Sequence, residues 1–348
     1  MNTIASLCKE LKQKRKPRIG RLDKPVAFWS EPDRFNDEII YAFVIILKTK
    51  GCSWASESGC SMCGYFNDSA FVDISDDDLL SQFNTAMQSY KDEPVVKIFT
   101  SGSFFDTNEI SINVRNKIFA ELSNKTKKTA VESRLEHIRK EILDDVAVSL
   151  STMQLEVGIG LESSNDDIRE KHVNKGFTFQ EYKDASKLLK SYNHLIKTYV
   201  LVKPPFLSEQ QAIKDCINTI EQVKDITDTI SLNPTNVQKG TLVQFLWNRR
   251  YYRPPWLWSV IEILKQGSII TKKRLQCDVS GGGSVRGTHN CKKCDKLALN
   301  AIRHFSLSQN SKDLDNIECG CKKQWEDQLS LEQISFGSLI DMRRGLIP

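Results

Sequence analysis

Between residues 41 and 240 the sequence alternates short apolar runs with segments of helical periodicity, and this alternation restricts the fold more than any other feature. Because parallel strands need helical crossovers, the pattern predicts an α/β fold with a parallel sheet. Six apolar runs bounded by polar turns have the character of strands; they span residues 41–47, 95–99, 128–131, 155–161, 197–202 and 229–232. Helical spacing is found in residues 76–90, 114–122, 179–191 and 209–223.

Six strands are too few for a closed eight-stranded barrel, so we expect a partial (β/α)6 barrel. In such folds the functional site lies at the carboxyl ends of the strands. We expect the barrel to span residues 41–240, after a basic N-terminal segment, 1–40. A small basic C-terminal subdomain, 241–348, is expected after the barrel.

The first predicted strand runs directly into a loop that carries three cysteines, Cys52, Cys60 and Cys63. A structural zinc site requires four protein ligands. An iron–sulfur cluster held by three thiolates instead leaves one iron open to an exogenous ligand, which is an arrangement for chemistry. We therefore interpret the loop as a catalytic cluster site. A zinc loop or three unrelated cysteines are the alternatives.

Later strands also end in groups that suit ligand binding. Small residues after the second strand let a ligand approach the backbone closely. An acid and an arginine after the third strand suit a ribose hydroxyl or amine and a carboxylate, respectively, and a further acid ends the fourth strand. A surface ion pair is the alternative for any one of these acids. The candidate residues are Ser101, Gly102, Ser103, Glu132, Arg134 and Glu162.

The segment 167–176, after the fourth strand, is rich in charged residues. Its basic side chains suit the carboxylate of a ligand. Ion pairs between side chains three and four residues apart on a helix explain the same pattern equally well. We therefore assign it no role from the sequence.

The C-terminal region carries a second set of metal-ligand types. Paired cysteines about 25 residues apart are typical of a structural zinc site in a reducing compartment. Six candidates compete for four places, and the simplest set leaves out Cys277 and His289, although Cys277 is able to replace one member of the second pair. A second iron–sulfur cluster is the alternative. The expected zinc ligands are Cys291, Cys294, Cys319 and Cys321.

Basic charge is concentrated toward the two ends of the chain. Residues 1–24 carry eight Lys and Arg against two acids, and residues 246–304 carry twelve against three, whereas residues 25–245 carry twenty-four against thirty-two. Clustered basic charge favours a polyanionic partner. Arginines and aromatic residues alternate in 246–258, which suits RNA phosphates and splayed bases, although the tryptophans can equally pack an interface. Further basic residues that support RNA are Lys272, Lys273, Arg274, Arg286, Lys292 and Lys293.

The bulk composition favours a cytoplasmic protein. No apolar stretch approaches the roughly 20 residues that a membrane span requires, so no membrane association is expected. The N-terminal residues lack the apolar centre of a signal peptide. The ten cysteines fall largely in metal-like clusters rather than in a disulfide framework, which favours a reducing compartment.

The stretch 51–65 resembles the cluster loop of radical S-adenosylmethionine (SAM) enzymes, whose commonest spacing is Cys-x3-Cys-x2-Cys; here the first gap holds seven residues. Together with residues 132–134, 158–179 and 277–294, it makes the chain similar to the archaeosine-biosynthesis radical SAM enzymes, distant relatives of the Elongator-type proteins. The resemblance implies a 4Fe-4S cluster on the three loop cysteines. It also implies that the strand-end residues hold SAM, with the small-residue motif on its methionine amino group.

For function, the resemblance implies a C–N lyase in tRNA modification. In that family a partner, archaeosine synthase, attaches lysine to a deazaguanine base in archaeal tRNA. The radical enzyme, supplied by an external electron donor, then cleaves a carbon–nitrogen bond of the lysine moiety to leave archaeosine. Two alternatives remain: another radical SAM tRNA-modifying enzyme, methylthiolating or Elongator-type, and a non-catalytic zinc-dependent RNA-binding protein.

Overall fold

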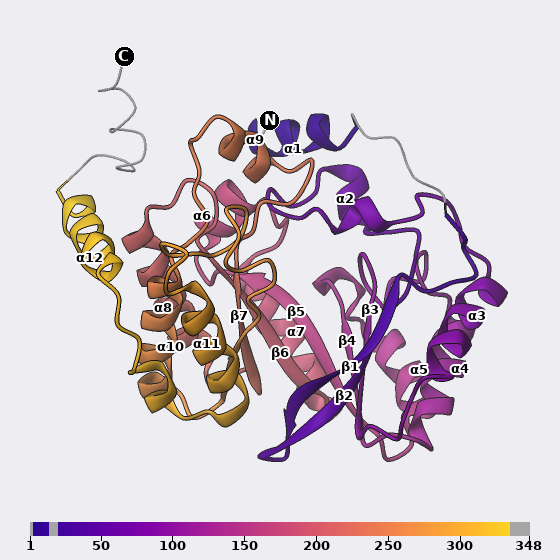
Figure 1. Cartoon of the computed structure of the whole chain (residues 1–348). Helices are drawn as coiled ribbons and strands as arrows, with labels where there is room; N and C mark the ends of the chain where they lie inside the picture. The colour runs from indigo at the N-terminus through magenta and orange to yellow at the C-terminus, as the bar shows by residue number, and fades with distance from the viewer. Residues whose placement is uncertain (1–2, 14–19, 335–348) are drawn as a thin grey trace.

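The computed structural model describes residues 3–13 and 20–334, in which an eight-stranded sheet curls into an open half-barrel (Figure 1). The strands follow the order of the sequence, β1 to β8, from one edge to the other. The first pair is antiparallel and every later pair is parallel. The strands are β1 (Ala27–Phe35), β2 (Glu38–Ile46), β3 (Val95–Phe99), β4 (Lys128–Glu132), β5 (Gln154–Glu162), β6 (Leu195–Val202), β7 (Thr229–Pro234) and β8 (Arg274–Cys277).

Helices cover the outer, convex face of the sheet, and shorter segments lie around its upper opening (Figure 1). The opening at the carboxyl ends of the parallel strands is called the mouth below. The main helices are α1 (Thr3–Gln13), α2 (Ser53–Glu57), α3 (Asp76–Met87), α4 (Ile112–Ser123), α5 (Lys140–Leu150), α7 (Phe179–Ser191), α8 (Glu209–Val223), α9 (Leu242–Asn248), α10 (Leu257–Ile270), α11 (Asp295–Ser308) and α12 (Cys321–Glu332).

The predicted α/β partial barrel is confirmed. The six predicted strands are β2 to β7, and the four predicted helices are α3, α4, α7 and α8. Strands β1 and β8 were not predicted, because β1 contains Pro32 and several charged residues and β8 has only four residues. Proline is tolerated in β1 because an edge strand has one side free of ladder hydrogen bonds.

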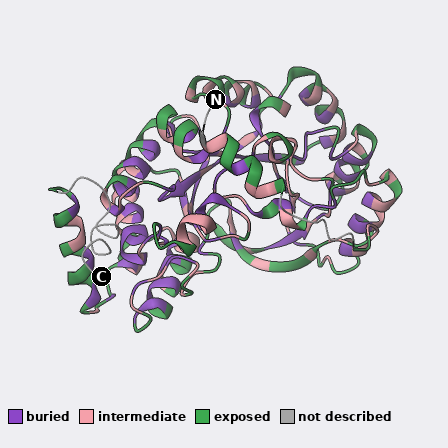
Figure 2. Cartoon of the chain, turned by 90° about the horizontal axis from the view of Figure 1, so that it is seen from above, coloured by how far each residue is buried: buried purple, intermediate pink, exposed green. Residues whose placement is uncertain are grey.

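The apolar core lies between the sheet and its outer helices. Alternate strand residues such as Val96 and Ile98 are fully buried there, together with Phe104 and Phe119 beneath the helices. Figure 2 shows this separation from above, with buried residues along the sheet and exposed residues on the outer sides of the helices. Burial of this apolar face fixes which strand residues point toward the outer helices and which point into the concave interior.

The inner, concave face of the sheet is polar, and its lower part is closed by a network of buried ion pairs. Lys97 contacts Glu31 at 2.8 Å and Asp33 at 2.9 Å. The Glu156 carboxylate lies 3.0 Å from the Lys128 ammonium group and 2.8 Å from that of Lys197, on β6. All of these charges are buried except that of Glu31, whose side chain is 36% exposed. Each buried charge is paired, which is the condition under which proteins retain it.

The ion pairs also connect the two edges of the sheet. The Arg274 guanidinium, on β8, lies 2.5 Å from the Asp33 carboxylate, on β1, and donates to the Arg34 carbonyl oxygen at 2.8 Å. Arg34 donates in turn to the carbonyl oxygen of Leu307, in α11. Arg274 therefore does not belong to an RNA-binding surface, and that prediction is wrong.

The division of the chain at residues 40 and 240 stays a prediction, although the sheet extends past both positions. Residues 14–18, which carry four of the eight basic residues of 1–24, lie outside the described residues. Among residues 3–13 and 20–334, no helix is both long enough and apolar enough to cross a bilayer.

Candidate functional site

The three cysteines expected to hold a cluster lie on a loop, residues 52–63, that follows β2 at the mouth. The seven residues between the first two cysteines do not form an extended insertion. Five of them form helix α2, which begins after Cys52. Gly59, with a φ of +79°, then turns the chain toward Cys60. The wide spacing that separates this loop from the commonest radical SAM pattern is thus accommodated by one short helix.

This cysteine loop is held by the segment after β5 to which the sequence assigned no role. Residues 169–173 form a π-helical turn, a feature often found at functional sites. The Ser61 amide donates to the Val173 carbonyl oxygen at 2.8 Å, and the Ser61 hydroxyl donates to the His172 carbonyl oxygen at 2.7 Å. Asn174 donates to the Gly59 carbonyl oxygen at 2.9 Å. The segment therefore supports the loop through its backbone and an amide side chain.

The thiols of the loop lie close enough to influence one another. Burial, and then the neighbouring Cys60, raises the pKa of the Cys63 thiol to about 11. Burial also raises the pKa of Cys52, although the nearby Arg134 guanidinium lowers it. Metal binding would therefore displace protons from these thiols. Three soft ligands with an open coordination position fit an iron–sulfur cluster.

Within the part of the chain that the structure describes, the four C-terminal cysteines form a group whose ligand atoms all lie within 4.8 Å of one another. A single metal ion would require such close sulfur atoms, whereas a 4Fe-4S cluster binds each thiolate through a different iron. The cysteine loop supplies three cysteines and no fourth. Three thiolates suit a cluster better than a structural zinc ion, which takes four protein ligands.

The small residues after β3 pack directly against the cysteine loop. A Cβ atom on Gly102 would lie 2.7 Å from the Cys52 Cα and 2.2 Å from a carboxylate oxygen of Glu109. Glu109 is buried, accepts from the Ser103 amide at 2.6 Å, and also accepts from the hydroxyl of Thr49 at the end of β2. Glu109, whose carboxylate bonds groups from both loops, was not predicted, because it lies six residues beyond Ser103 in the strand-end motif.

Three of the other predicted strand-end residues already have hydrogen-bond or ion-pair partners in the protein. Ser103 accepts from the Arg134 amide at 3.0 Å, which links the ends of β3 and β4. The Arg134 guanidinium donates to the Glu136 carboxylate, and also to the backbone carbonyl oxygen of Lys175 at 3.0 Å. Glu162 forms an ion pair of 2.7 Å with Lys175. Burial raises the pKa of the Glu132 carboxylate, against the lowering effect of Tyr199, on β6. Ser101 and Gly102 are half-buried.

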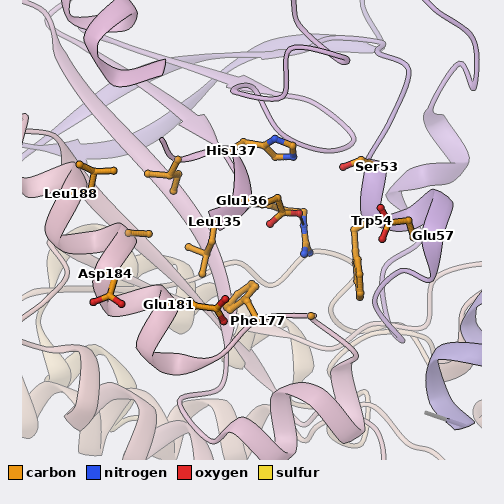
Figure 3. Close-up of a pocket in the computed structure, with 14 residues that line it drawn as sticks. Ser53, Trp54, Glu57, Leu135, Glu136, His137, Phe177, Glu181, Asp184 and Leu188 are labelled. Atoms are coloured by element: carbon orange, nitrogen blue, oxygen red, sulfur yellow. Dashed lines mark hydrogen bonds and ion pairs between the residues drawn. The ribbon is translucent and has the colours of Figure 1, made fainter. Parts of the chain in front are cut away.

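A cavity of about 660 Å³ opens beside the cysteine loop, between α2 and α7. Figure 3 shows Trp54 and Glu57 on one side of it and Asp184 on the other. Of the six predicted strand-end residues, Arg134 alone lines this cavity, where its guanidinium lies 5.1 Å from the centroid of the Trp54 ring. The cavity is lined by Ser53, Trp54, Glu57, Arg134, Leu135, Glu136, His137, Ile138, Gly176, Phe177, Glu181, Asp184, Ala185 and Leu188.

The C-terminal region brings together the four cysteines expected to bind zinc. The sulfur of Cys291 lies 3.9 Å from that of Cys294 and 3.6 Å from that of Cys319, and the sulfurs of Cys294 and Cys321 are 3.6 Å apart. Four thiolates bound at 2.3 Å in a tetrahedron stand about 3.8 Å apart. The site therefore has the dimensions for a single tetrahedral metal ion.

Donors from the surrounding residues face these sulfurs. The indole of Trp258 donates to Cys321 at 3.3 Å, and the amide side chain of Asn290 donates to Cys294 at 3.4 Å. Such bonds orient and stabilise metal-bound thiolates. Cys277 and His289, the competing ligands, are not part of the group. The His289 ring instead contacts the carbonyl oxygen of Gly287 at 2.7 Å.

In the arginine- and aromatic-rich segment, residues 246–258, some side chains are buried and others are exposed. Trp258 is buried within the C-terminal subdomain, as the packing alternative expects. Arg249 and Tyr251 are exposed, and the Arg249 guanidinium stacks 3.5 Å from the centroid of the Phe245 ring. Helix α9, which leads into this segment, contacts the cysteine loop: the Val243 amide donates to the Ser61 carbonyl oxygen at 3.3 Å. The exposed basic residues are thus placed at the mouth.

Comparison with known proteins gives three similar chains. Archaeosine synthase subunit beta of Methanosarcina acetivorans is 40% identical over 336 residues, covering 95% of this chain and 97% of that protein. The protein of the same name from Thermococcus kodakarensis is 35% identical over 310 residues, covering 86% and 95%. An uncharacterised protein of Methanocaldococcus jannaschii is 40% identical over 347 residues, covering 96% and 94%. No family model matches the chain.

Solved structures are similar at a more distant level. Elp3 of Methanocaldococcus infernus has a TM-score of 0.45 at 15% identity, covering 56% of this chain and 50% of that one. Methylornithine synthase has a TM-score of 0.49 at 10% identity, covering 79% and 70%. Spore photoproduct lyase has a TM-score of 0.45 at 12% identity, covering 80% and 78%.

Proposed function

Because the chain belongs to the archaeosine synthase subunit beta family, we propose that it is a radical SAM enzyme that completes archaeosine in tRNA. Its reaction is the cleavage of a carbon–nitrogen bond in the lysine moiety of a lysine-modified deazaguanine base. Its partner is the archaeosine synthase subunit that attaches the lysine. The word "subunit" in the relatives' name supports such a partner.

The observation that carries this proposal is the cysteine loop at the mouth of the half-barrel. Cys52, Cys60 and Cys63 hold a 4Fe-4S cluster through three of its irons, and the supply of three thiols in the loop rather than four supports this assignment. When bound, the cluster and SAM would supply the one-electron and radical chemistry that cleavage of this carbon–nitrogen bond requires. The chain itself binds, orients and excludes water.

The strand-end residues position SAM beside the loop. Ser101, Gly102 and Ser103 offer backbone groups to the methionine end, and Gly102 permits this because it has no Cβ to collide with Cys52. Glu132 accepts from a hydroxyl or ammonium group of SAM with the carboxylate that Tyr199 orients.

Arg134 and Glu162 act from the adjacent strand ends. The Arg134 guanidinium lies near the cysteine loop, where its charge lowers the pKa of Cys52 against the effect of burial. This charge suits the carboxylate of SAM, which Arg134 would help to hold beside the cysteine loop. Glu162 fixes Lys175 and so shapes the wall behind SAM. Gly160 makes room for that ion pair, because a Cβ there would lie 2.5 Å from the Lys175 ammonium nitrogen.

The tRNA enters at the mouth, where the exposed basic segment after α9 adjoins the cysteine loop. Arg249 supplies charge for phosphates and Tyr251 a ring for stacking, whereas the buried Trp258 belongs to the metal subdomain. Cys291, Cys294, Cys319 and Cys321 bind one structural zinc ion, and the sulfur spacing supports zinc over a second iron–sulfur cluster.

The reaction is tested with tRNA that carries the lysine-modified base, SAM, and dithionite as the electron donor. We expect archaeosine and 5′-deoxyadenosine to form together, measured by mass spectrometry of nucleoside digests. The Cys60→Ala variant should form neither. Equal product from this variant, or archaeosine formed without SAM, would contradict the proposal.

A further inference from the structure

Helix α1 lies across the cysteine loop at the mouth, beside α2 and α9 (Figure 1). The Ser58 hydroxyl, in the loop, donates to the Ala5 carbonyl oxygen at 3.4 Å. On the same helix the side chain of Cys8 is buried, with 2% of its surface exposed. The helix is therefore packed onto the loop, although the sequence analysis treated it only as part of a basic segment.

One residue of α1, Lys12, reaches the part of the loop that carries Cys60. Its ammonium group donates to the Cys60 carbonyl oxygen at 3.4 Å and lies 5.1 Å from the centroid of the Phe66 ring. Gly59 makes room for it, because a Cβ atom there would lie 1.5 Å from the ammonium nitrogen. Gly59 and Cys60, on the cysteine loop, and Phe66, beside it, therefore all lie against this single side chain.

The charge of Lys12 has no acidic partner in the described residues. Among residues 3–13 and 20–334, no carboxylate forms an ion pair with it, whereas most lysines inside the half-barrel are paired. Lys12 is half-buried, so solvent and salt screen its charge less than that of a surface lysine. A cation without an acidic partner among the described residues stabilises negative charge on the adjoining cysteine loop.

We propose that Lys12 is a positioning residue of the cluster site, which fixes the loop at Cys60 and favours the reduced cluster. This inference rests on the proposed function. Reduction adds one negative charge to a cluster, so a nearby cation stabilises the reduced form more than the oxidised form. Lys12 therefore makes it easier for an electron donor to reduce the enzyme.

The experiment compares three variants of the full chain, each reconstituted anaerobically with iron and sulfide. Lys12→Gln removes the charge and the contacts that depend on it, and Lys12→Arg keeps the charge. Lys9→Gln is the matched control, because it removes the same charge from an exposed position on the same helix. The readout is the midpoint potential of the cluster, measured by potentiometric titration followed by electron paramagnetic resonance.

We expect Lys12→Gln to lower the ratio of reduced to oxidised cluster about tenfold at a given potential, which is a shift of ~59 mV for one electron. Lys9→Gln should shift the ratio by less than about twofold, because solvent and salt screen an exposed charge. Lys12→Arg should keep the wild-type potential, because arginine retains the positive charge. Equal potentials for Lys12→Gln and Lys9→Gln would overturn this inference alone. A wild-type chain that binds no iron would overturn the proposed function as well.

Discussion

The Asp33 carboxylate and the Arg274 guanidinium form an ion pair of 2.5 Å that joins the first strand of the sheet to the last. The two strands are the opposite edges of an open sheet and share no backbone ladder. The side chains of Asp33 and Arg274 are only 5% and 15% exposed, and Lys97 lies 2.9 Å from the same carboxylate. The half-barrel is therefore closed at its lower end by side-chain charges.

Breaking this link should destabilise the fold. Asp33→Asn leaves the buried Arg274 without a carboxylate and Lys97 with Glu31 alone, and we expect a loss of about 3–5 kcal/mol in the free energy of unfolding. The control is Asp37→Asn in the same hairpin, because Asp37 pairs with Arg34 at 3.0 Å but is 95% exposed. This control should cost about 1 kcal/mol or less. Urea unfolding measures both, and equal losses would contradict the closing role of Asp33.

Gly102→Ala should impair SAM cleavage without unfolding the protein. The new Cβ would lie 2.7 Å and 2.9 Å from the Cys52 Cα and amide nitrogen, so the cysteine loop must shift. Misplacement of reacting groups by about 1 Å can cost roughly 100-fold in rate, and a loss of that order is expected in 5′-deoxyadenosine formation. Gly320→Ala is the control, because a Cβ there meets nothing within 4 Å. A normal rate for Gly102→Ala would show that this contact does not position SAM.

The C-terminal metal site should contain one zinc ion bound by four cysteines. Cys291→Ser is expected to lose the zinc and to lower the unfolding temperature, because a structural metal site supplies folding free energy. Cys277→Ala and His289→Ala should keep one zinc per chain, because neither residue belongs to the cysteine group. Elemental analysis of the purified variants decides the set. Zinc lost from Cys277→Ala would reinstate Cys277 as a ligand.

His194 should make the protein less stable in mild acid. Its side chain is buried, its Nε2 has no hydrogen-bond partner among the described residues, and burial lowers its pKa to about 4. Below an unfolded pKa of about 6.5 the unfolded chain takes up a proton that the folded chain refuses, so stability falls as the pH falls. From pH 7 to pH 5 this effect is about 2 kcal/mol.

The test for His194 uses urea unfolding of wild type and His194→Gln at the two pH values. Other groups titrate in both proteins, so the relevant quantity is the difference between their pH dependences. We expect the wild type to lose about 2 kcal/mol more than the variant over this range. The same pH dependence in both proteins would mean that His194 is protonated in the fold.

The central strands and helices could be predicted because their apolar periodicity reflects burial against the outer helices. Strand β3 matches its predicted bounds, and so do helices α7 and α8. Strand β1 was not predicted because its charged side chains face the polar interior of the half-barrel, where they pair with partners distant in sequence. Its Asp33 pairs with Lys97 and Arg274, and no local pattern reveals such pairing.

The cysteines of the candidate site could be predicted from their spacing, but the residues that support them could not. Nothing in the sequence near Cys60 indicates that Asn174, over a hundred residues later, holds its loop, or that Lys12 covers it. Glu109 was missed for the same reason, since its partners Thr49 and Ser103 belong to two different strand ends. Ligand types are local in sequence, whereas the groups that orient them are brought together by the fold.

The most direct test of the account is metal and sulfide analysis of the anaerobically reconstituted protein, together with its electron paramagnetic resonance spectrum before and after SAM is added. The account predicts about four irons and one zinc per chain, since three loop cysteines hold one 4Fe-4S cluster and four C-terminal cysteines hold one zinc. The spectrum of the reduced cluster should change when SAM binds the open iron. Zinc without iron, or a cluster that does not respond to SAM, would contradict the assignment of a radical SAM enzyme.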